Sequence, residues 1–260
     1  MPEIKLACMS LMWGMCNLAN DQVPQWIDDI KAADYDGVAL FDGELRRMTD
    51  EIDFKSLLND HGLSLASVDY FIDNDNEHLH QVCEIMQSYK SRHLVTIGGL
   101  ATPEADPQEI ADILNVMGEI ALTYDIHACY HNHTNDLGET CEQTENLLSL
   151  TDPNKFFGFV DTGHATKDFI EFPVAERATR FLQRNWERID FIEFKDWSEQ
   201  YDLCTELGAG TCDYVSVFAL LKEKKYSGWI TVEQNGVMGD KTAAESAKAS
   251  ADFIRKGLEL

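Results

Sequence analysis

Four short polar motifs in the second half of the chain contain side chains suited to acid–base or metal chemistry. They are HNH at 131–133, DTGH at 161–164, EFKD at 193–196 and EQN at 233–235. Buried carboxylates without a counter-charge are costly or stay protonated, so a cation is the economical partner for several of them. Oxygen ligands with one imidazole nearby favour Mn²⁺, Mg²⁺ or Co²⁺ over a structural zinc ion. The motifs therefore point to a divalent-metal centre.

The elements that must position these motifs recur along the whole chain. Eight short apolar or β-branched runs alternate with longer segments of helical period, and the runs begin at Ile4, Gly37, Leu63, His93, Ile126, Phe156, Ile189 and Gly228. Their spacing matches one strand–helix unit of a barrel of about 250 residues. This predicts a single-domain (β/α)8 TIM barrel over residues 1–260. The alternative, an open doubly wound sheet, usually has a glycine-rich first turn that this chain lacks.

In such a barrel the motifs lie at the carboxyl ends of strands, where barrel enzymes build their active sites. Because side chains alternate along a strand, Asp161, Glu193 and Glu233 can all point inward and meet at the mouth. Structural interpretations stay open for single residues. Asp161 is also a good helix N-cap, and Glu193 could form an ordinary ion pair with Lys195. The two histidines of the HNH motif could be core side chains that only orient their neighbours.

Composition excludes several classes of partner. The 260 residues contain 46 Asp and Glu against 21 Lys and Arg, a net charge of −25, which repels nucleic acid and acidic membrane surfaces. No apolar run is long enough to cross a bilayer, and the amino terminus lacks the pattern of a secretory signal, so we expect a cytoplasmic protein. The seven cysteines include no C-x-x-C pair and are expected to be reduced, mostly buried thiols.

The order HNH, DTGHA, EFKD, LGAG and VEQN resembles the xylose-isomerase-like TIM barrels, the broad sugar isomerase/epimerase family. The spacing of residues in the run HNHTNDLGET at 131–140 is similar to that in inosose-dehydratase-like members. The resemblance implies one divalent metal ion, held by one residue from each of strands five to eight. The implied ligands are Glu139, Asp161, Glu193 and Glu233, with Asp136 as the alternative to Glu139. Many members have histidine where this chain has Glu193, and a fourth carboxylate favours Mg²⁺ or Mn²⁺, with Co²⁺ as a further candidate.

The resemblance also implies roles in catalysis. Glu139 and Glu233 would exchange protons with the substrate, while the substrate-binding residues would be His131, His133, His164 and Lys195. Trp13, Phe41 and Trp197 are candidates for apolar walls. Two positions depart from the family: Ala39 and Ala209 stand where relatives often carry an acid.

The expected function is a metal-dependent isomerase or epimerase of a keto sugar or polyol-derived ketone, acting through a metal-stabilised enediolate. The alternative is a lyase that dehydrates a keto-inositol, keto sugar or 3-keto-glycoside. A non-catalytic sugar-binding protein with a degenerate site is the alternative outside enzymes. An abasic-site endonuclease shares the fold, but the net charge of −25 counts against it. The expected partner is a small carbohydrate, and a homo-oligomer is compatible with the resemblance.

Overall fold

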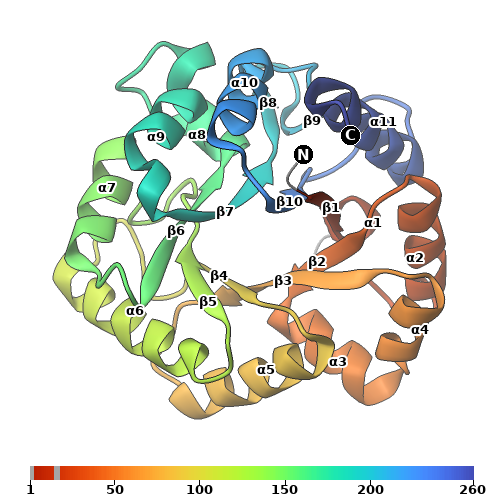
Figure 1. Cartoon of the computed structure of the whole chain (residues 1–260), viewed down its shortest axis with the longest axis horizontal. Helices are drawn as coiled ribbons and strands as arrows, with labels where there is room; N and C mark the ends of the chain where they lie inside the picture. The colour runs from red at the N-terminus through yellow and green to blue at the C-terminus, as the bar shows by residue number, and fades with distance from the viewer. Residues whose placement is uncertain (1–2, 15–17) are drawn as a thin grey trace.

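Eight parallel strands close into a barrel in the computed structural model, which describes residues 3–14 and 18–260. The strands surround the centre of the molecule and the helices form a ring outside them (Figure 1). The barrel strands are β1 (Ile4–Met9), β2 (Gly37–Phe41), β3 (Ser64–Phe71), β4 (His93–Ile97), β5 (His127–Tyr130), β6 (Phe156–Asp161), β7 (Ile189–Phe194) and β10 (Gly228–Val232). Their order around the barrel is β1-β10-β7-β6-β5-β4-β3-β2. The predicted TIM barrel is therefore confirmed.

Helices connect successive strands, as the helical period of the intervening segments predicted. The helices are α1 (Leu11–Gly14), α2 (Val23–Ala32), α3 (Asp42–Glu51), α4 (Phe54–Asp60), α5 (Asn76–Tyr89), α6 (Pro107–Leu122), α7 (Cys141–Leu150), α8 (Thr162–Asp168), η1 (Val174–Glu176), α9 (Arg177–Asn185), η2 (Trp186–Arg188), α10 (Tyr214–Lys224) and α11 (Ala243–Leu258). Two short antiparallel strands, β8 (Asp196–Ser198) and β9 (Asp202–Thr205), form a separate ribbon after β7. None of the helices that the structure describes is long and apolar enough to cross a membrane.

Helix α6 shows how local sequence sets these elements. Its N-cap Asp106 accepts hydrogen bonds from the backbone N–H groups of Gln108 and Glu109, and Pro107 occupies the first turn, where its missing N–H costs nothing. Buried residues then recur every three or four positions, among them Ile110 and Leu114. That period places one apolar stripe against the barrel.

The barrel interior is a packed plug of apolar side chains rather than a pore. Val95, Cys129, Phe159 and Phe191 are buried there, and Phe157 and Trp229 pack against them. Residues at alternate positions of β6 and β7 thus point inward, as the strand period predicted. The next inward positions toward the carboxyl ends of these strands are Asp161 and Glu193, which are paired in register.

The cysteines that the structure describes are unpaired thiols, the form that the sequence predicted. Six of them are free thiols, and all except Cys204 are buried. Cys16 lies outside the described residues.

Candidate functional site

The predicted carboxylates gather at the carboxyl ends of β6, β7 and β10. Asp161 ends β6, Glu193 is the penultimate residue of β7, and Glu233 directly follows β10. Asp161 and Glu193 are essentially inaccessible to solvent, and Glu233 is 7% exposed. Lys195, fully buried beside them, follows the end of β7. The structure therefore brings together three carboxylic side chains and one lysine, all of them buried.

The Lys195 ammonium lies among these carboxylates. Its Nζ donates a hydrogen bond to Glu233 Oε1 and lies 3.6 Å from Asp161 Oδ2. Burial alone would lower the pKa of Lys195, but the facing carboxylates of Glu233 and Asp161 raise it above its ordinary value. Lys195 is therefore charged at neutral pH. The alternative pairing with Glu193 is not the one the structure adopts, because the side chain turns toward Glu233 and Asp161.

Asp161 serves as a helix cap and faces the site at the same time. Its Oδ1 accepts the backbone N–H groups of Gly163 and His164, at 2.6 and 2.9 Å, and so caps α8. Its Oδ2 is buried without a hydrogen-bond partner among the described residues. Burial raises the pKa of Asp161 to about 6. The N-cap interpretation is thus confirmed, and it leaves one carboxylate oxygen for a ligand.

The donor atoms near this oxygen fit a divalent metal ion. His131 Nε2 lies 3.4 Å from Glu193 Oε1 and 3.7 Å from Asp161 Oδ2. One donor atom from each of His131, Glu193 and Glu233 lies within 4.8 Å of the other two. Glu193 Oε1 is buried without a hydrogen bond in the described part of the chain, and burial raises the pKa of Glu193 well above its usual range. A cation would remove that penalty, since it compensates the buried charge.

His131 enters this group although the sequence assigned it to substrate binding. Its ring stacks on Phe159 with centroids 5.0 Å apart, and burial lowers the pKa of His131 well below its usual value. The imidazole is therefore neutral, the form that ligates metals.

The two candidates for the strand-five ligand have other partners. Glu139 Oε2 accepts the backbone N–H of Asn135 at 2.8 Å, and Asp136 Oδ2 accepts that of Gly98 at 2.9 Å. Burial raises the pKa of Asp136 to about 6. Neither carboxylate belongs to the group formed by His131, Glu193 and Glu233. In this structure the Glu139 carboxylate thus contacts its own loop, and its metal-ligand or acid–base role stays a prediction.

The remaining histidines of the motifs lie next to the acids. The rings of His133 and His164 are 4.1 Å apart. His164 Nδ1 contacts the Thr134 hydroxyl at 2.9 Å, so its Nε2 is directed toward Asp161 Oδ2, 3.7 Å away. Burial lowers the pKa of His164 well below its ordinary value. His164 is thus a neutral imidazole aimed at the site, whereas His133 is only half-buried.

Asp69 is a site residue that the sequence interpretation missed. It lies near the end of β3, is 2% exposed, and has a pKa raised well above its usual range, first by burial and then by the charge of Glu233. Barrel closure brings this acid to the same mouth. The available signal was an acid inside the otherwise apolar run LSLASVDYF.

The backbone of the EFKD segment is fixed by hydrogen bonds from two directions. The Thr162 hydroxyl contacts the backbone carbonyl and N–H of Lys195, and the Tyr214 hydroxyl donates to the same carbonyl at 3.0 Å. Asp196 accepts four backbone N–H groups, from Trp197, Gly208, Gly210 and Cys212. Asp196 therefore anchors the LGAG loop beside the site.

The three aromatic candidates for apolar walls have local partners. Trp13 donates its indole N–H to Asp29, Trp197 donates to Asp202, and Phe41 stacks on Phe71 with centroids 5.6 Å apart. A substrate contact stays a prediction for all three.

Comparison with known proteins identifies the family. The sequence model of the family described as xylose isomerase-like TIM barrel matches residues 27–257 of this chain. An inosose dehydratase from Geobacillus kaustophilus (strain HTA426) is 31% identical over 171 residues, which cover 58% of this chain and 54% of the relative. The chain thus spans about half the length of the curated relatives it matches.

Two solved structures share the fold. D-allulose 3-epimerase from Methylomonas sp., in complex with D-allulose, has a TM-score of 0.77 and 16% identity, with 98% of both chains covered. The IOLI protein with a bound zinc atom has a TM-score of 0.74 and 15% identity, also with 98% of both covered. Because the family model matches most of the chain, this protein belongs to the xylose isomerase-like TIM barrel family.

Proposed function

We propose that this protein is a divalent-metal-dependent lyase that removes water from a cyclic polyol ketone of the keto-inositol class. The observation that carries the proposal is the buried group of Asp161, Glu193, Glu233 and Lys195 at the barrel mouth. Elimination beside a carbonyl needs a base for the weakly acidic proton, positive charge near the enolate oxygen and a proton for the leaving hydroxyl. This group and its histidines contain candidates for all three.

The metal would be held by Asp161, Glu193, Glu233 and His131. Mg²⁺ or Mn²⁺ suits this oxygen-rich set, and when bound the ion would polarise the substrate carbonyl. Relatives named inosose dehydratase support dehydration, and IOLI contains zinc in the same fold.

Three side chains of the site would have separate roles in the reaction. Glu233 is the base, because it is the least buried carboxylate of the group and its partner Lys195 keeps it near the mouth. The ammonium of Lys195 balances negative charge that develops on the substrate oxygen. His164, a neutral imidazole with Nε2 directed into the site, would donate a hydrogen bond to the leaving hydroxyl, and the proton that Glu233 removes from carbon would pass to that hydroxyl, which leaves as water. The buried surroundings exclude water, so these interactions are stronger than in solvent.

Epimerisation is the second candidate, favoured by Asp69. Inverting one carbon requires two groups on opposite faces of the substrate. Asp69 on β3 and Glu233 after β10 reach the mouth from different strands that are not neighbours in the barrel. In this alternative Glu233 would remove a proton from one face of the carbon, and Asp69, kept protonated by burial, would give its own proton to the opposite face. The D-allulose 3-epimerase fold relative supports this alternative only at the level of fold.

The test is proton NMR in D₂O on Mg²⁺-loaded protein with a keto-inositol, alongside a panel of ketoses. Dehydration would give a product that lacks one ring hydroxyl, while epimerisation would give deuterium beside the carbonyl with all hydroxyls retained. Glu233→Gln should lower either rate by about 10² to 10⁴. Glu119→Gln, at an exposed position on α6, is the matched control and should leave the rate unchanged. Absence of exchange and of product with metal bound would refute both candidates.

A further inference from the structure

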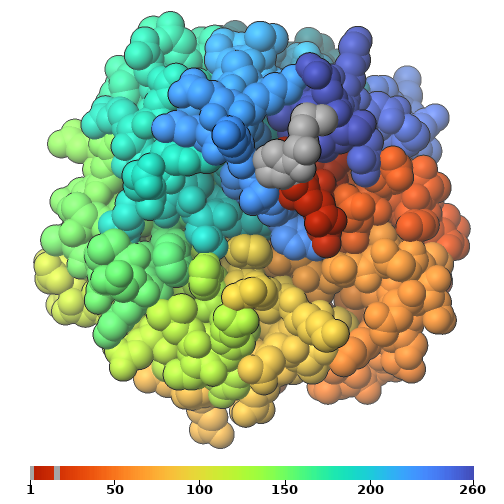
Figure 2. Space-filling view, viewed as in Figure 1, coloured from red at the N-terminus to blue at the C-terminus, as the bar shows by residue number. Residues whose placement is uncertain are grey.

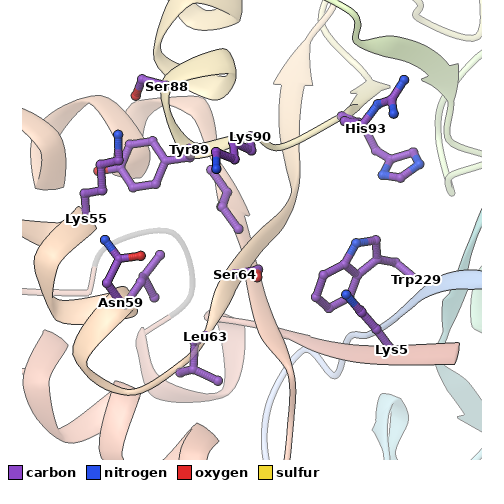
Figure 3. Close-up of a pocket in the computed structure, with 13 residues that line it drawn as sticks. Lys5, Lys55, Asn59, Leu63, Ser64, Ser88, Tyr89, Lys90, His93 and Trp229 are labelled. Carbon is purple, nitrogen blue, oxygen red and sulfur yellow. The ribbon is translucent and has the colours of Figure 1, made fainter. Parts of the chain in front are cut away.

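A pocket of about 630 Å³ lies at the amino ends of the barrel strands, the end opposite to the carboxylate site. Its walls include Lys5 of β1, Ser64 of β3, His93 of β4 and Trp229 of β10, each the first or second residue of its strand. Figure 3 shows Lys55, Tyr89 and Lys90 on one side of Ser64, and His93, Trp229 and Lys5 on the other. The red, orange and yellow segments that supply most of these walls adjoin in the surface view (Figure 2). The pocket is therefore separate from the proposed catalytic centre.

The charge of this pocket is opposite to that of the molecule. Its lining includes Lys5, Lys55, Lys90 and Arg92 but no aspartate or glutamate. The whole chain has more than two acids for each lysine or arginine. Like charges gathered in one hollow repel each other, and this cost is relieved when an anion binds.

The lysines of the pocket are the cations available to a ligand. Arg92 is paired with Asp125 at 2.6 Å, whereas among the described residues Lys5 pairs only with the exposed Glu3, 3.6 Å away. No carboxylate of the described residues lies within 4.0 Å of the ammonium groups of Lys55 or Lys90. A lysine ammonium is a compact point charge that binds phosphate, while arginine adds bidentate contacts to carboxylate or phosphate. The three lysines are thus suited to the oxygens of phosphate groups.

Two aromatic side chains hold lysines in this pocket. Lys5 Nζ lies 5.7 Å from the centroid of the Trp229 ring, and Lys55 Nζ lies 5.8 Å from that of Tyr89. The Trp229 ring packs against Gly37, where a Cβ atom would lie 2.9 Å from the ring. The Tyr89 hydroxyl is hydrogen-bonded to that of Thr49 at 3.0 Å. These contacts hold the two rings, so two apolar walls are in place before a ligand arrives, each with a lysine ammonium beside it.

We infer that this pocket binds a small organic molecule carrying at least two phosphate groups. Its volume is in the range of small-molecule sites, which is larger than one phosphate needs. The phosphates would contact lysines on the two sides of Ser64, and the organic part would lie along Tyr89 or Trp229. Because the apolar plug separates the two ends of the barrel, this ligand would not be a substrate of the carboxylate site.

Calorimetric titration of the metal-free full chain tests this inference, with pyrophosphate, ADP and adenosine as probes in low-salt buffer containing EDTA. Pyrophosphate and ADP should each bind once per chain and compete, and adenosine should not bind. The double variant Lys55→Gln with Lys90→Gln should weaken ADP binding about tenfold, two to five times for each exposed lysine. Lys256→Gln, an exposed lysine of α11 outside the pocket, makes the same type of charge change and should alter the affinity less than twofold.

Two results would overturn the inference. One is unchanged affinity in the double variant, and the other is an equal loss in Lys256→Gln, which would reveal only a general surface field. Glu233→Gln should retain ADP binding, because it lies at the other end of the barrel. Tighter binding in that variant would mean that the probe occupies the carboxylate site instead, because the substitution removes a negative charge there.

Discussion

The side-chain amide of Asn132 takes the place of a backbone peptide group beside Asp161. The Asp161 N–H donates to Asn132 Oδ1 at 2.9 Å, and Asn132 Nδ2 donates to the Asp161 carbonyl at 3.1 Å. Strand β5 has ended two residues earlier, at Tyr130, so this amide continues the pairing of β5 with β6. Both residues are fully buried. The position of the Asp161 carboxylate thus depends on its neighbour.

Asn132→Ala should therefore destabilise the protein by about 3 kcal/mol, because it leaves a buried N–H and a buried carbonyl without partners. It should also weaken metal binding, since Asp161 loses its fixed position. Urea unfolding and metal titration would measure the two effects. Asn154→Ala, at an exposed asparagine, is the control and should change stability by less than about 0.5 kcal/mol. Equal stability in the two variants would contradict the role of the amide.

Lys195→Met should make folding depend on a divalent ion. Removing this buried ammonium leaves the carboxylates of Asp161 and Glu233 without their positive partner, which costs about 3–5 kcal/mol. Mn²⁺ would compensate them instead, so the loss in unfolding free energy should be large in EDTA and smaller with Mn²⁺. Lys155→Met, at an exposed ion pair, should show neither effect. A loss that is the same in EDTA and Mn²⁺ would show that no ion takes the place of the ammonium.

Asp161 should give the metal-free protein an unusual dependence on pH. Burial raises its pKa from 3.8 to about 6, so the folded chain binds this proton more tightly than the unfolded chain does. Stability from this residue is then lost as pH rises, by about 2 kcal/mol between pH 4 and pH 6. Urea unfolding in EDTA across this interval measures the slope, and Asp161→Asn should flatten it. A stability that instead increases from this residue over the interval would contradict the prediction.

Gly210→Ala should disturb the loop that Asp196 anchors. A Cβ atom at this position would lie 2.2 Å from Asp196 Oδ1 and 2.5 Å from the Trp197 carbonyl oxygen, so the loop must shift. We expect a loss of about 1–3 kcal/mol in thermal or urea unfolding. Gly43→Ala, in helix α3 with no atom within 4 Å of the new methyl group, should instead gain about 0.5–1 kcal/mol. Similar losses in both variants would contradict the steric argument.

Glu139 offers a test of the fifth-strand loop. If the loop keeps its bond from the Asn135 N–H to Glu139, Glu139→Gln should change metal affinity less than twofold, whereas Glu193→Gln should lower it at least tenfold. Metal titration followed by calorimetry compares the two. A large loss in Glu139→Gln would mean that the loop rearranges on metal binding, as the family resemblance implies.

The barrel and most of the carboxylate group could be predicted because they depend on regular periods. All eight predicted strands start within one residue of their observed positions; for example, Leu63 precedes the start of β3 at Ser64. Strand alternation then places Glu193 and Glu233 inward without further information. Asp69 could not be assigned to the site in this way, because only barrel closure brings β3 near Glu233. Glu139 depends on a loop in which Asn135 has a φ of +62°, a local conformation that no period encodes.

The apolar plug beneath the carboxylates gives the site a single entrance. Val95, Phe159 and Phe191 fill the barrel below Asp161 and Glu193, so no hydrated ion can arrive from that side. A metal ion and a substrate must pass through the same mouth, and the substrate is the larger of the two. For the proposed metal and substrate this predicts ordered binding, in which the ion enters first and a bound substrate traps it until the product leaves.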